Sequence, residues 1–405
     1  MGVTLKKPAT RFPDIRIARS LLVVGVNFLI LEIGCYVILT FAAETRPNYF
    51  DWEYFVRSVD HESARDFMAK AYDADLGWNT QPNSQITYKN SAGLDVVETY
   101  DAVGARTNPQ FVDEILASSY GDSWTQGAEV SDSLTWQYFL STTLGSNVQN
   151  FGVGAYGTDQ ALLKLERDLK RGNRTPIIIL GILEMNINRI VNTYRPFYYP
   201  AAGMKFGFKP RFILRPDGDL ELIPNPMSQY SDRSDALAAL EVAKEHDFWF
   251  RRSESRIRIS FPFSITTLDL LWRVLHRKGF VEHPFWEDRA ELDTSLWHMP
   301  NPSSIMERII DRFHSLGRDF GFRPFVLFMP SVALREDGTI EDPTYLHFVS
   351  ELRARYRDKD LTVIDISEAN FDPTRFRIRP EAGHASAYGN RIIADYVLSY
   401  LVNKR

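Results

Sequence analysis

A serine in the first third of the chain lies in a turn whose residue types favour nucleophilic chemistry. Gly121, Asp122 and Ser123 follow an apolar run at 111–116 and precede a helical pattern, which predicts a strand, a tight turn and a helix. Glycine permits the bend, and the first N–H groups of a helix can bind an anion. A nucleophilic serine needs both an exposed hydroxyl and such donors. The same tripeptide is also an ordinary turn with a helix cap, so the interpretation depends on the downstream sequence.

Three further stretches follow predicted strands, at the strand ends where parallel sheets bind ligands. The loop at 150–160 consists largely of small residues and opens onto a helix, so it can present backbone N–H groups. Asn186 comes just after an apolar strand at 176–183. His384 lies three residues after Glu381, a spacing at which the carboxylate can orient the imidazole ring. The chain therefore offers a nucleophile, an oriented base and candidate oxyanion donors.

These four stretches, in this order, resemble the SGNH hydrolases, also called the GDSL esterase family. The resemblance runs from about residue 113 to the C-terminus, with one large insertion. It implies that Ser123 is the nucleophile and that its backbone N–H is an oxyanion donor. It also implies that the side-chain amide of Asn186 is a further donor and that His384 is the general base.

Two positions depart from the family pattern. Glu381 stands where the triad acid is usually aspartate, although the longer side chain can still reach the imidazole. The glycine of the second conserved stretch falls at Ala155, directly after Gly154. Because the donor there is a backbone N–H, alanine keeps it, and both positions are candidates for this part of the oxyanion hole.

Strands and helices alternate along the main part of the chain. The strand at 176–183 is apolar on both faces, which is typical of a parallel sheet covered by helices on both sides. We therefore predict an α/β fold, a three-layer α/β/α domain with a parallel sheet. The family resemblance implies that this domain is flavodoxin-like. The predicted helices are 131–144, 158–170, 302–321, 343–357 and 387–401, and the predicted strands are 111–116, 148–153, 176–183, 324–329 and 361–366.

The N-terminus has the pattern of a membrane anchor. A basic leader at 1–19 precedes an apolar stretch at 20–43, which is long enough to cross a bilayer as a helix. Glu32 interrupts this stretch at a cost of about 2–3 kcal/mol, which the surrounding apolar residues outweigh. Basic residues stay in the cytoplasm, so we expect a single span with a cytoplasmic N-terminus and a periplasmic main domain. A cleaved signal peptide is the alternative, which the long leader and the poor cleavage box at 40–42 disfavour.

The rest of the chain divides around the predicted catalytic stretches. Residues 44–110 are polar and rich in turns, and we expect them to pack as a lead-in on a hydrolase-like domain at 111–405. An insertion at about 189–301 carries aromatic residues at 194–199. Their rings either stack on sugar rings or pack the insertion onto the domain. A hairpin is predicted at 212–223 within the insertion.

Composition excludes several classes of function. The net charge of -5 gives no reason to expect a nucleic-acid partner. The single cysteine, Cys35, lies in the apolar stretch, which argues against a disulfide, a thiol enzyme and a cysteine metal site. The histidines lack metal-ligand spacing and no glycine-rich phosphate loop is present, so we expect neither a metal nor a cofactor.

The sequence thus predicts an extracytoplasmic, membrane-anchored serine esterase. It would act through an acyl-enzyme on O-acyl esters, above all O-acetyl esters, of a small molecule or a glycan. One alternative is an O-acetyltransferase in polysaccharide modification that uses the same site. A second is a non-catalytic glycan-binding or assembly component on the same scaffold. The acyl group, the acceptor and any protein partner stay open at this point.

Overall fold

The computed structural model describes residues 15–46, 49–57, 61–110, 114–199, 206–229, 235–252, 256–277, 294–329, 344–379 and 382–402. These residues form two compact units. The first unit combines residues 1–58 with 254–287, and the second contains 59–253 and 288–405. The predicted insertion is therefore divided, because part of it packs with the N-terminal helix.

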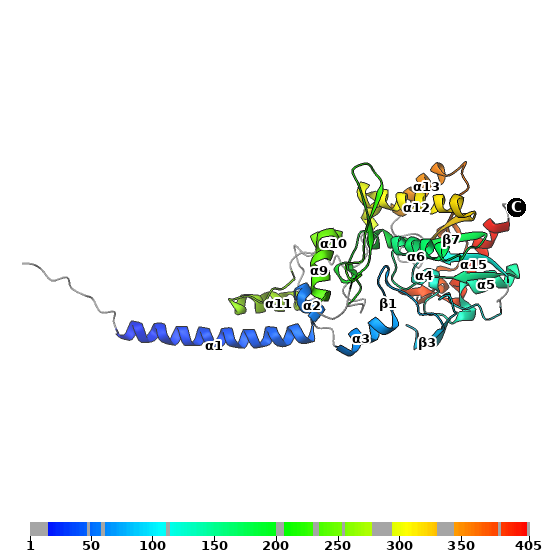
Figure 1. The fold of residues 1–405 in the computed structure, drawn as a ribbon. Helices are drawn as coiled ribbons and strands as arrows, with labels where there is room; N and C mark the ends of the chain where they lie inside the picture. The colour runs from blue at the N-terminus through cyan, green and yellow to red at the C-terminus, as the bar shows by residue number, and fades with distance from the viewer. Residues whose placement is uncertain are drawn as a thin grey trace, which may run out of the picture. The chain divides into compact units, whose positions relative to one another are not determined.

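A five-stranded parallel sheet is the centre of the second unit (Figure 1). Its strands lie in the order β11-β10-β7-β5-β6. Numbered along the chain, this order is 2-1-3-4-5, the order of flavodoxin-like doubly wound folds. The predicted fold class is confirmed. The strands are β5 (Ile115–Tyr120), β6 (Asn147–Asn150), β7 (Ile177–Leu183), β10 (Arg323–Met329) and β11 (Thr362–Asp365).

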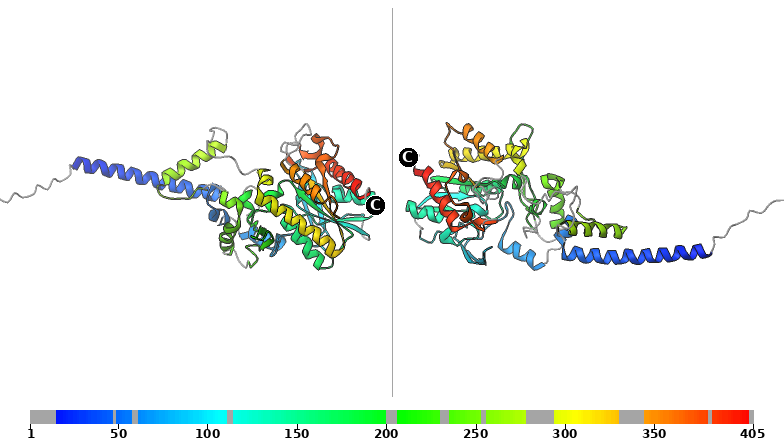
Figure 2. Two further views of the ribbon diagram at one scale, coloured as in Figure 1. Left: turned by 90° about the horizontal axis from the view of Figure 1, so that it is seen from above. Right: turned by 180° about the vertical axis from the view of Figure 1, so that it is seen from behind.

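Helices cover both faces of this sheet (Figures 1 and 2). All seven residues of β7 are buried, as its apolar sequence requires. Ile177, Ile179 and Leu183 belong to the core cluster beneath one pair of helices, and the alternate residues face the other pair. The first pair is α5 (Trp136–Leu144) and α15 (Ala387–Val402), and the second is α6 (Thr158–Lys170) and α12 (Pro300–Phe320).

Three predicted elements differ from the observed ones, and one of them is the strand predicted at 148–153, which is Asn147–Asn150. The strand before the serine turn is Ile115–Tyr120, whereas the prediction was 111–116, of which 111–113 lie outside the described residues. Buried Ser118 and Ser119 continue the strand because their hydroxyl groups have hydrogen-bond partners on β6. The predicted helix 131–144 is split at Thr135, whose backbone is extended and whose side chain caps α5.

Short elements complete the second unit. The predicted hairpin at 212–223 is confirmed as β8 (Arg211–Leu214) and β9 (Leu220–Ile223), which pair in antiparallel register. A second hairpin, β3 (Ser84–Lys89) and β4 (Asp95–Tyr100), precedes the sheet. The others are α3 (His61–Lys70), β1 (Tyr72–Asp73), β2 (Gly77–Trp78), α4 (Ser123–Gln126), η2 (Asp132–Leu134), α7 (Asn186–Arg189), α8 (Arg195–Tyr198), α9 (Asp235–His246), α10 (Phe248–Arg252), η4 (Thr294–His298), α13 (Thr344–Arg355), η5 (Ile366–Glu368), α14 (Pro373–Phe376), β12 (Arg377–Arg379) and β13 (Ala382–Ala385).

The aromatic residues of the insertion form a core. Tyr194, Phe197 and Tyr198 are all buried, and the Tyr194 ring stacks on Phe208 with 4.2 Å between centroids. Rings that pack on one another in this way offer no face to a sugar. These three rings therefore pack the insertion internally and do not stack on a sugar.

The first unit contains α1 (Ile15–Thr45), α2 (Trp52–Arg57) and α11 (Phe263–Arg277). Residues Arg19–Thr45 of α1 are long and apolar enough to cross a membrane, as either an anchor or a signal sequence. The side chains of α1 are mostly exposed apart from a few that face α11. In both views α11 meets the half of α1 that leads to Thr45 (Figures 1 and 2).

Candidate active site

Ser123 is the first residue of α4 and is separated from the end of β5 only by the turn residues Gly121 and Asp122. Asp122 is the N-cap of α4, and its Oδ1 accepts a hydrogen bond from the Trp124 N–H at 3.0 Å. Because the first N–H groups of a helix have no intrahelical acceptor, the Ser123 N–H is available to an oxyanion. The predicted arrangement of strand, turn and helix is confirmed.

Two glycines allow the turn to pack directly against its neighbours. A Cβ atom on Gly121 would lie 2.1 Å from Thr125 Oγ1 and 2.9 Å from the Gly181 carbonyl oxygen. A Cβ atom on Gly152 would lie 2.2 Å from the backbone nitrogen of Gln126. No side chain fits at either position, so the loop after β6 lies against the backbone of α4.

A buried arginine, which sequence analysis did not identify, joins three of the predicted site stretches. Arg189 Nη1 donates to Asp122 Oδ2 at 2.8 Å and to the Tyr156 carbonyl oxygen at 2.9 Å. Arg189 ends α7, the short helix that begins at Asn186. One guanidinium group therefore connects the serine turn, the loop after β6 and the Asn186 helix through charge-assisted hydrogen bonds.

The loop after β6 presents two candidate N–H donors. Ala155 has φ 64°, a left-handed conformation that is uncommon for alanine and natural for the glycine expected there. Neither Gly154 nor Ala155 donates its N–H to an acceptor among the described residues. The Gly154 carbonyl oxygen instead accepts a hydrogen bond from Trp78 Nε1 at 2.9 Å, which holds the loop in place.

Asn186 lies at the end of β7, as predicted, and is 1% exposed. Its Oδ1 atom is buried without a hydrogen-bond partner in the described structure. A buried polar group without a partner is costly unless a ligand or water completes its hydrogen bonds. Because an amide oxygen only accepts hydrogen bonds, the Asn186 atom that could bind an oxyanion is Nδ2.

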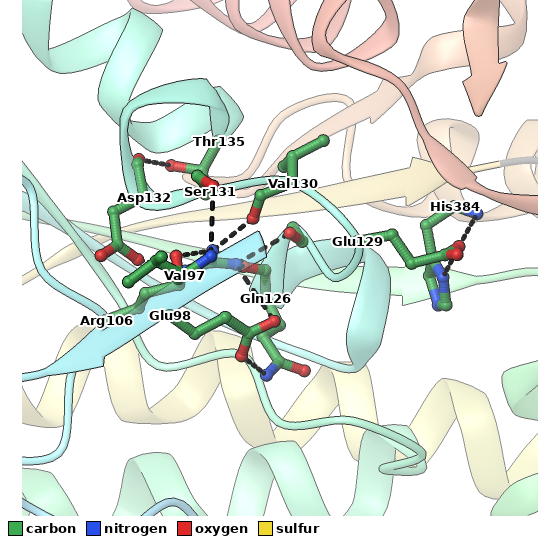
Figure 3. A network of polar contacts seen from close by, with 12 residues as sticks. Val97, Glu98, Arg106, Gln126, Glu129, Val130, Ser131, Asp132, Thr135 and His384 are labelled. Carbon is green, nitrogen blue, oxygen red and sulfur yellow. Dashed lines mark hydrogen bonds and ion pairs between the residues drawn. The ribbon is translucent and has the colours of Figure 1, made fainter. Parts of the chain in front are cut away.

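The imidazole of His384 is held by Glu129, a residue that sequence analysis did not single out. Glu129 Oε2 lies 2.8 Å from His384 Nδ1 and also accepts the backbone N–H of His384 at 2.9 Å. Gly383, with φ 98°, takes a left-handed conformation directly before the histidine. Figure 3 shows the carboxylate of Glu129 directed at both nitrogens. Since an ionised carboxylate only accepts hydrogen bonds, Nδ1 carries the proton and Nε2 is the basic nitrogen of the neutral ring.

Glu381, the predicted partner of His384, lies outside the described residues. The ring nitrogen that it was expected to orient is already bonded to Glu129. Glu129 follows Ser123 by six positions and reaches His384 only through tertiary structure. Nothing in the local sequence around Glu129 distinguishes it from a solvated carboxylate, so no sequence signal could have revealed this role.

Residues of the β3–β4 hairpin fix Glu129 from the other side. Its Oε1 accepts the Ser91 N–H at 2.8 Å, and its own N–H donates to the Tyr88 hydroxyl at 2.9 Å. The hydrogen bond from His384 is the largest of the causes that lower the pKa of Glu129 below its ordinary value of 4.5. Glu129 is therefore ionised at neutral pH, and its charge is available to stabilise an imidazolium.

Arg106 holds the segment that connects α4 to Glu129. Its Nη1 donates to the carbonyl oxygens of Gln126 and Gly127 at 2.9 and 2.8 Å, and its Nε donates to Asp132 Oδ1 at 2.8 Å. A further hydrogen bond joins its Nη2 to the Val130 carbonyl oxygen. Arg106 is 2% exposed, and Figure 3 shows its guanidinium surrounded by these acceptors. The backbone on both sides of Glu129 is thereby fixed.

The serine and histidine stretches are neighbours. α4 packs against β13, and the His384 ring lies 6.2 Å from the buried ring of Trp124, the residue after Ser123. No hydrogen bond joins Ser123 Oγ to His384 Nε2 within the described part of the chain. Catalytic hydrogen bonds are often long in ligand-free enzymes and shorten in the substrate complex. The structure thus places the serine and histidine stretches side by side, and Arg189 connects the serine turn to the helix that begins at Asn186.

Comparison with known proteins gives structural matches only. No family model matches the chain, and no curated protein does. A member of the lipolytic protein G-D-S-L family from Veillonella parvula matches with a TM-score of 0.33 at 12% identity, over 72% of this chain and 99% of that one. A family 3 carbohydrate esterase from Clostridium thermocellum matches with a TM-score of 0.33 at 12% identity, over 72% and 97%.

An acetyl xylan esterase from the rumen bacterium Butyrivibrio proteoclasticus also matches, with a TM-score of 0.27 at 11% identity, over 74% of this chain and 66% of that one. By topology the chain is a flavodoxin-like α/β protein, and the solved structures that it matches include GDSL lipolytic proteins and carbohydrate esterases.

Proposed function

We propose that this chain is a serine esterase that acts through an acyl-enzyme. Ser123 Oγ attacks the ester carbonyl while His384 Nε2 takes the hydroxyl proton. The negative charge on the carbonyl oxygen is stabilised by the Ser123 N–H, an N–H of the loop after β6 and the Asn186 amide. His384 then protonates the leaving alkoxide as the C–O bond breaks. Water, deprotonated by His384, attacks the acyl-enzyme and releases the carboxylic acid and free Ser123.

The observation that carries this proposal is the hydrogen bond between Glu129 and His384 Nδ1. It fixes the tautomer in which Nε2 is unprotonated, and that ring lies beside the residue that follows Ser123. Glu129 acts through His384 and does not touch the substrate, so it is a positioning residue. A non-catalytic scaffold would not need a hydrogen-bond network that orients one histidine.

We propose α1 as an uncleaved anchor that places the site outside the cytoplasm. The basic leader supports this orientation. Leu39 and Ala43 of α1 form a buried cluster with Ile257 and Leu270, so α1 is a structural partner of the mature chain. An anchored extracytoplasmic site faces envelope polysaccharides, and we propose O-acetyl groups on a glycan as the substrate class to test first.

The experiment compares Ser123→Ala and Asn186→Ala with wild type in the full-length protein. Fluorophosphonate labelling reports the nucleophile, and hydrolysis of p-nitrophenyl acetate reports turnover. We expect Ser123→Ala to lose both. Asn186→Ala should still be labelled, more slowly, with turnover lower by about 10²–10³-fold, the usual cost of one oxyanion donor. Ser399→Ala, on the exposed face of α15, is the matched control and should behave as wild type.

Two results would contradict the proposal. Labelling of folded Ser123→Ala would exclude Ser123 as nucleophile, and full turnover in Asn186→Ala would remove Asn186 from the oxyanion hole. A second assay supplies an acetylated glycan with an unacetylated acceptor and measures free and transferred acetate. Predominant transfer would show that the same site works as an acetyltransferase.

A further inference from the structure

Helix α11 carries an exposed apolar face. Ile265, Leu268, Leu271 and Trp272 are 64%, 65%, 52% and 42% exposed. Their spacing of three and four residues places them on one side of the helix. The opposite side packs on α1, where Leu270 is buried. A water-exposed stripe of four large apolar side chains is costly, which indicates that another medium covers it.

This face is continuous with the exposed apolar surface of α1. Phe261, two residues before α11, is 64% exposed, and its ring lies 6.1 Å from that of Phe28 on α1. Leu29 and Ile33 of α1 are 59% and 61% exposed. The lipid that would surround α1 therefore meets the outer face of α11 as well.

Glu32 connects the two helices at the middle of α1. Its carboxyl group accepts hydrogen bonds from the N–H groups of Phe263 and Ser264, the latter at 3.3 Å, and the residue is 2% exposed. It lies midway between Arg19 and Thr45, the ends of the span. Backbone N–H groups inside a bilayer need acceptors from the protein, because no water is present. Glu32 supplies acceptors where the first N–H groups of α11 would otherwise lack them.

The chain before α11 runs along α1 in the opposite direction. Ile257 pairs with Phe50, beyond the end of α1, whereas Phe261 has reached Phe28. Helix α11 then returns, and its Leu270 packs beside Leu39 and Ala43 of α1. The segment therefore enters and leaves on the same side.

We propose that residues 257–277 form a re-entrant membrane hairpin, with α11 embedded in the lipid leaflet nearest Thr45 and Glu32 as its cap at the bilayer centre. From Phe263 to Trp272 the helix rises by about 14 Å, at about 1.5 Å per residue, which is close to half the hydrocarbon thickness of about 30 Å. Trp272 then lies at the membrane interface, where tryptophan is enriched. Arg273 and Asp269 form a bidentate ion pair at 2.9 Å near that level.

This inference rests on the proposal that α1 spans a membrane, and the test separates the two. In a Cys35→Ala background, single cysteines replace Leu29 on α1, Leu268 on α11 or Leu94 on the β3–β4 hairpin. Leu94 is the matched control, because it is 65% exposed like Leu268 but lies in the second unit. Each full-length protein is reconstituted in phosphatidylcholine vesicles and labelled with an environment-sensitive fluorophore. Quenching by lipids brominated along the acyl chain reports contact with hydrocarbon.

We expect strong quenching of the fluorophore at 29 and 268 and none at 94. Quenching at 29 without quenching at 268 would overturn the re-entrant hairpin and leave the anchor intact. Absence of quenching at both would contradict the anchor itself. A second copy of the chain could cover position 268 instead of lipid. The fluorophore would then self-quench in proportion to labelling density and would not respond to brominated lipid. That result would also overturn the proposal.

Discussion

Two carboxyl groups in separate units of this protein perform related tasks with different requirements. Glu129, in the loop after α4, accepts the backbone N–H groups of Ser91 and His384. Glu32, in the middle of α1, accepts those of Phe263 and Ser264. Each ties together segments that are far apart in the sequence. Only Glu129 also bonds a titratable ring, at His384 Nδ1.

The difference separates two properties of a carboxyl group. Backbone N–H groups need an oxygen acceptor, which a neutral amide can also supply. An imidazole that gains a proton during turnover needs a negative charge beside it and a fixed tautomer. Charge should therefore matter at Glu129 and be dispensable at Glu32, which exchange of each residue for its amide can test.

The largest effect is expected for Glu129→Gln. The amide can reverse the tautomer of His384 and cannot stabilise the imidazolium, so kcat should fall by up to about 10⁴-fold, as when a triad aspartate is replaced by asparagine. KM should change little, because the substrate is not touched. Glu381→Gln is the matched control, because Glu381 is the acid that the sequence predicts. We expect it to keep the wild-type kcat. Loss of kcat in Glu381→Gln with an active Glu129→Gln would reverse the assignment of the acid.

Arg106→Lys should lower turnover by a smaller factor. Lysine keeps the charge but cannot replace the planar fork that bonds the carbonyl oxygens of Gln126, Gly127 and Val130. The segment around Glu129 should shift, and a misplacement of about 1 Å can cost about 10²-fold in rate. Steady-state kinetics on protein shown to be folded by circular dichroism measures this. Wild-type kcat would mean that the hairpin contacts alone position Glu129.

At Glu32 the amide should be tolerated and alanine should not. Glu32→Gln retains an oxygen acceptor for the start of α11, whereas Glu32→Ala leaves buried N–H groups unpaired at about 1–3 kcal/mol each. The readout is modification of a cysteine at position 268 by a membrane-impermeant maleimide in vesicles. We expect slow modification in wild type and Glu32→Gln and faster modification in Glu32→Ala. Equal rates in all three would show that Glu32 does not hold α11.

The smallest effect concerns acid stability. The pKa of Glu129 is lowered in the folded state, chiefly by its hydrogen bond with His384. A carboxyl group of this kind adds stability above its unfolded pKa, and that contribution is lost as the pH falls through the folded pKa. The difference in unfolding free energy between wild type and Glu129→Gln should therefore be largest at neutral pH and shrink below pH 4.5. Denaturant titrations at several pH values measure it, and a constant difference would exclude this linkage.

The elements with strong periodicity were predictable from sequence. The uniformly apolar β7 and the helix Thr158–Lys170 were placed to within a residue, and their alternation indicated the parallel sheet. Ser123 and Asn186 could be placed at the ends of strands because each comes three residues after an apolar or strand-forming run. The predicted boundaries of helices and strands were wrong where tertiary contacts determine them. At Thr135, for example, a side-chain cap interrupts a helical pattern.

The partner of His384 could not be read from the sequence because it depends on a long-range contact. A carboxylate three residues before a histidine is visible as a pattern, whereas Glu129 lies 255 residues away. Its position depends on a left-handed backbone at Glu129 itself, with φ 69°, and on the hairpin that receives its N–H. The structural roles of Arg189 and Arg106 were missed for the same reason, because neither residue belongs to a recognisable motif.

The contacts of Glu129 with β3–β4 also bear on how such a protein can be divided or recombined. A fragment that starts at residue 111 would contain Ser123 and His384 but would lose Tyr88, Ser91 and Arg106. If the proposed mechanism holds, exchange of the upstream region between related proteins would alter the catalytic rate although Ser123 and His384 were unchanged. The part of the chain needed to position His384 therefore begins before the sheet, at the β3–β4 hairpin that bonds Glu129.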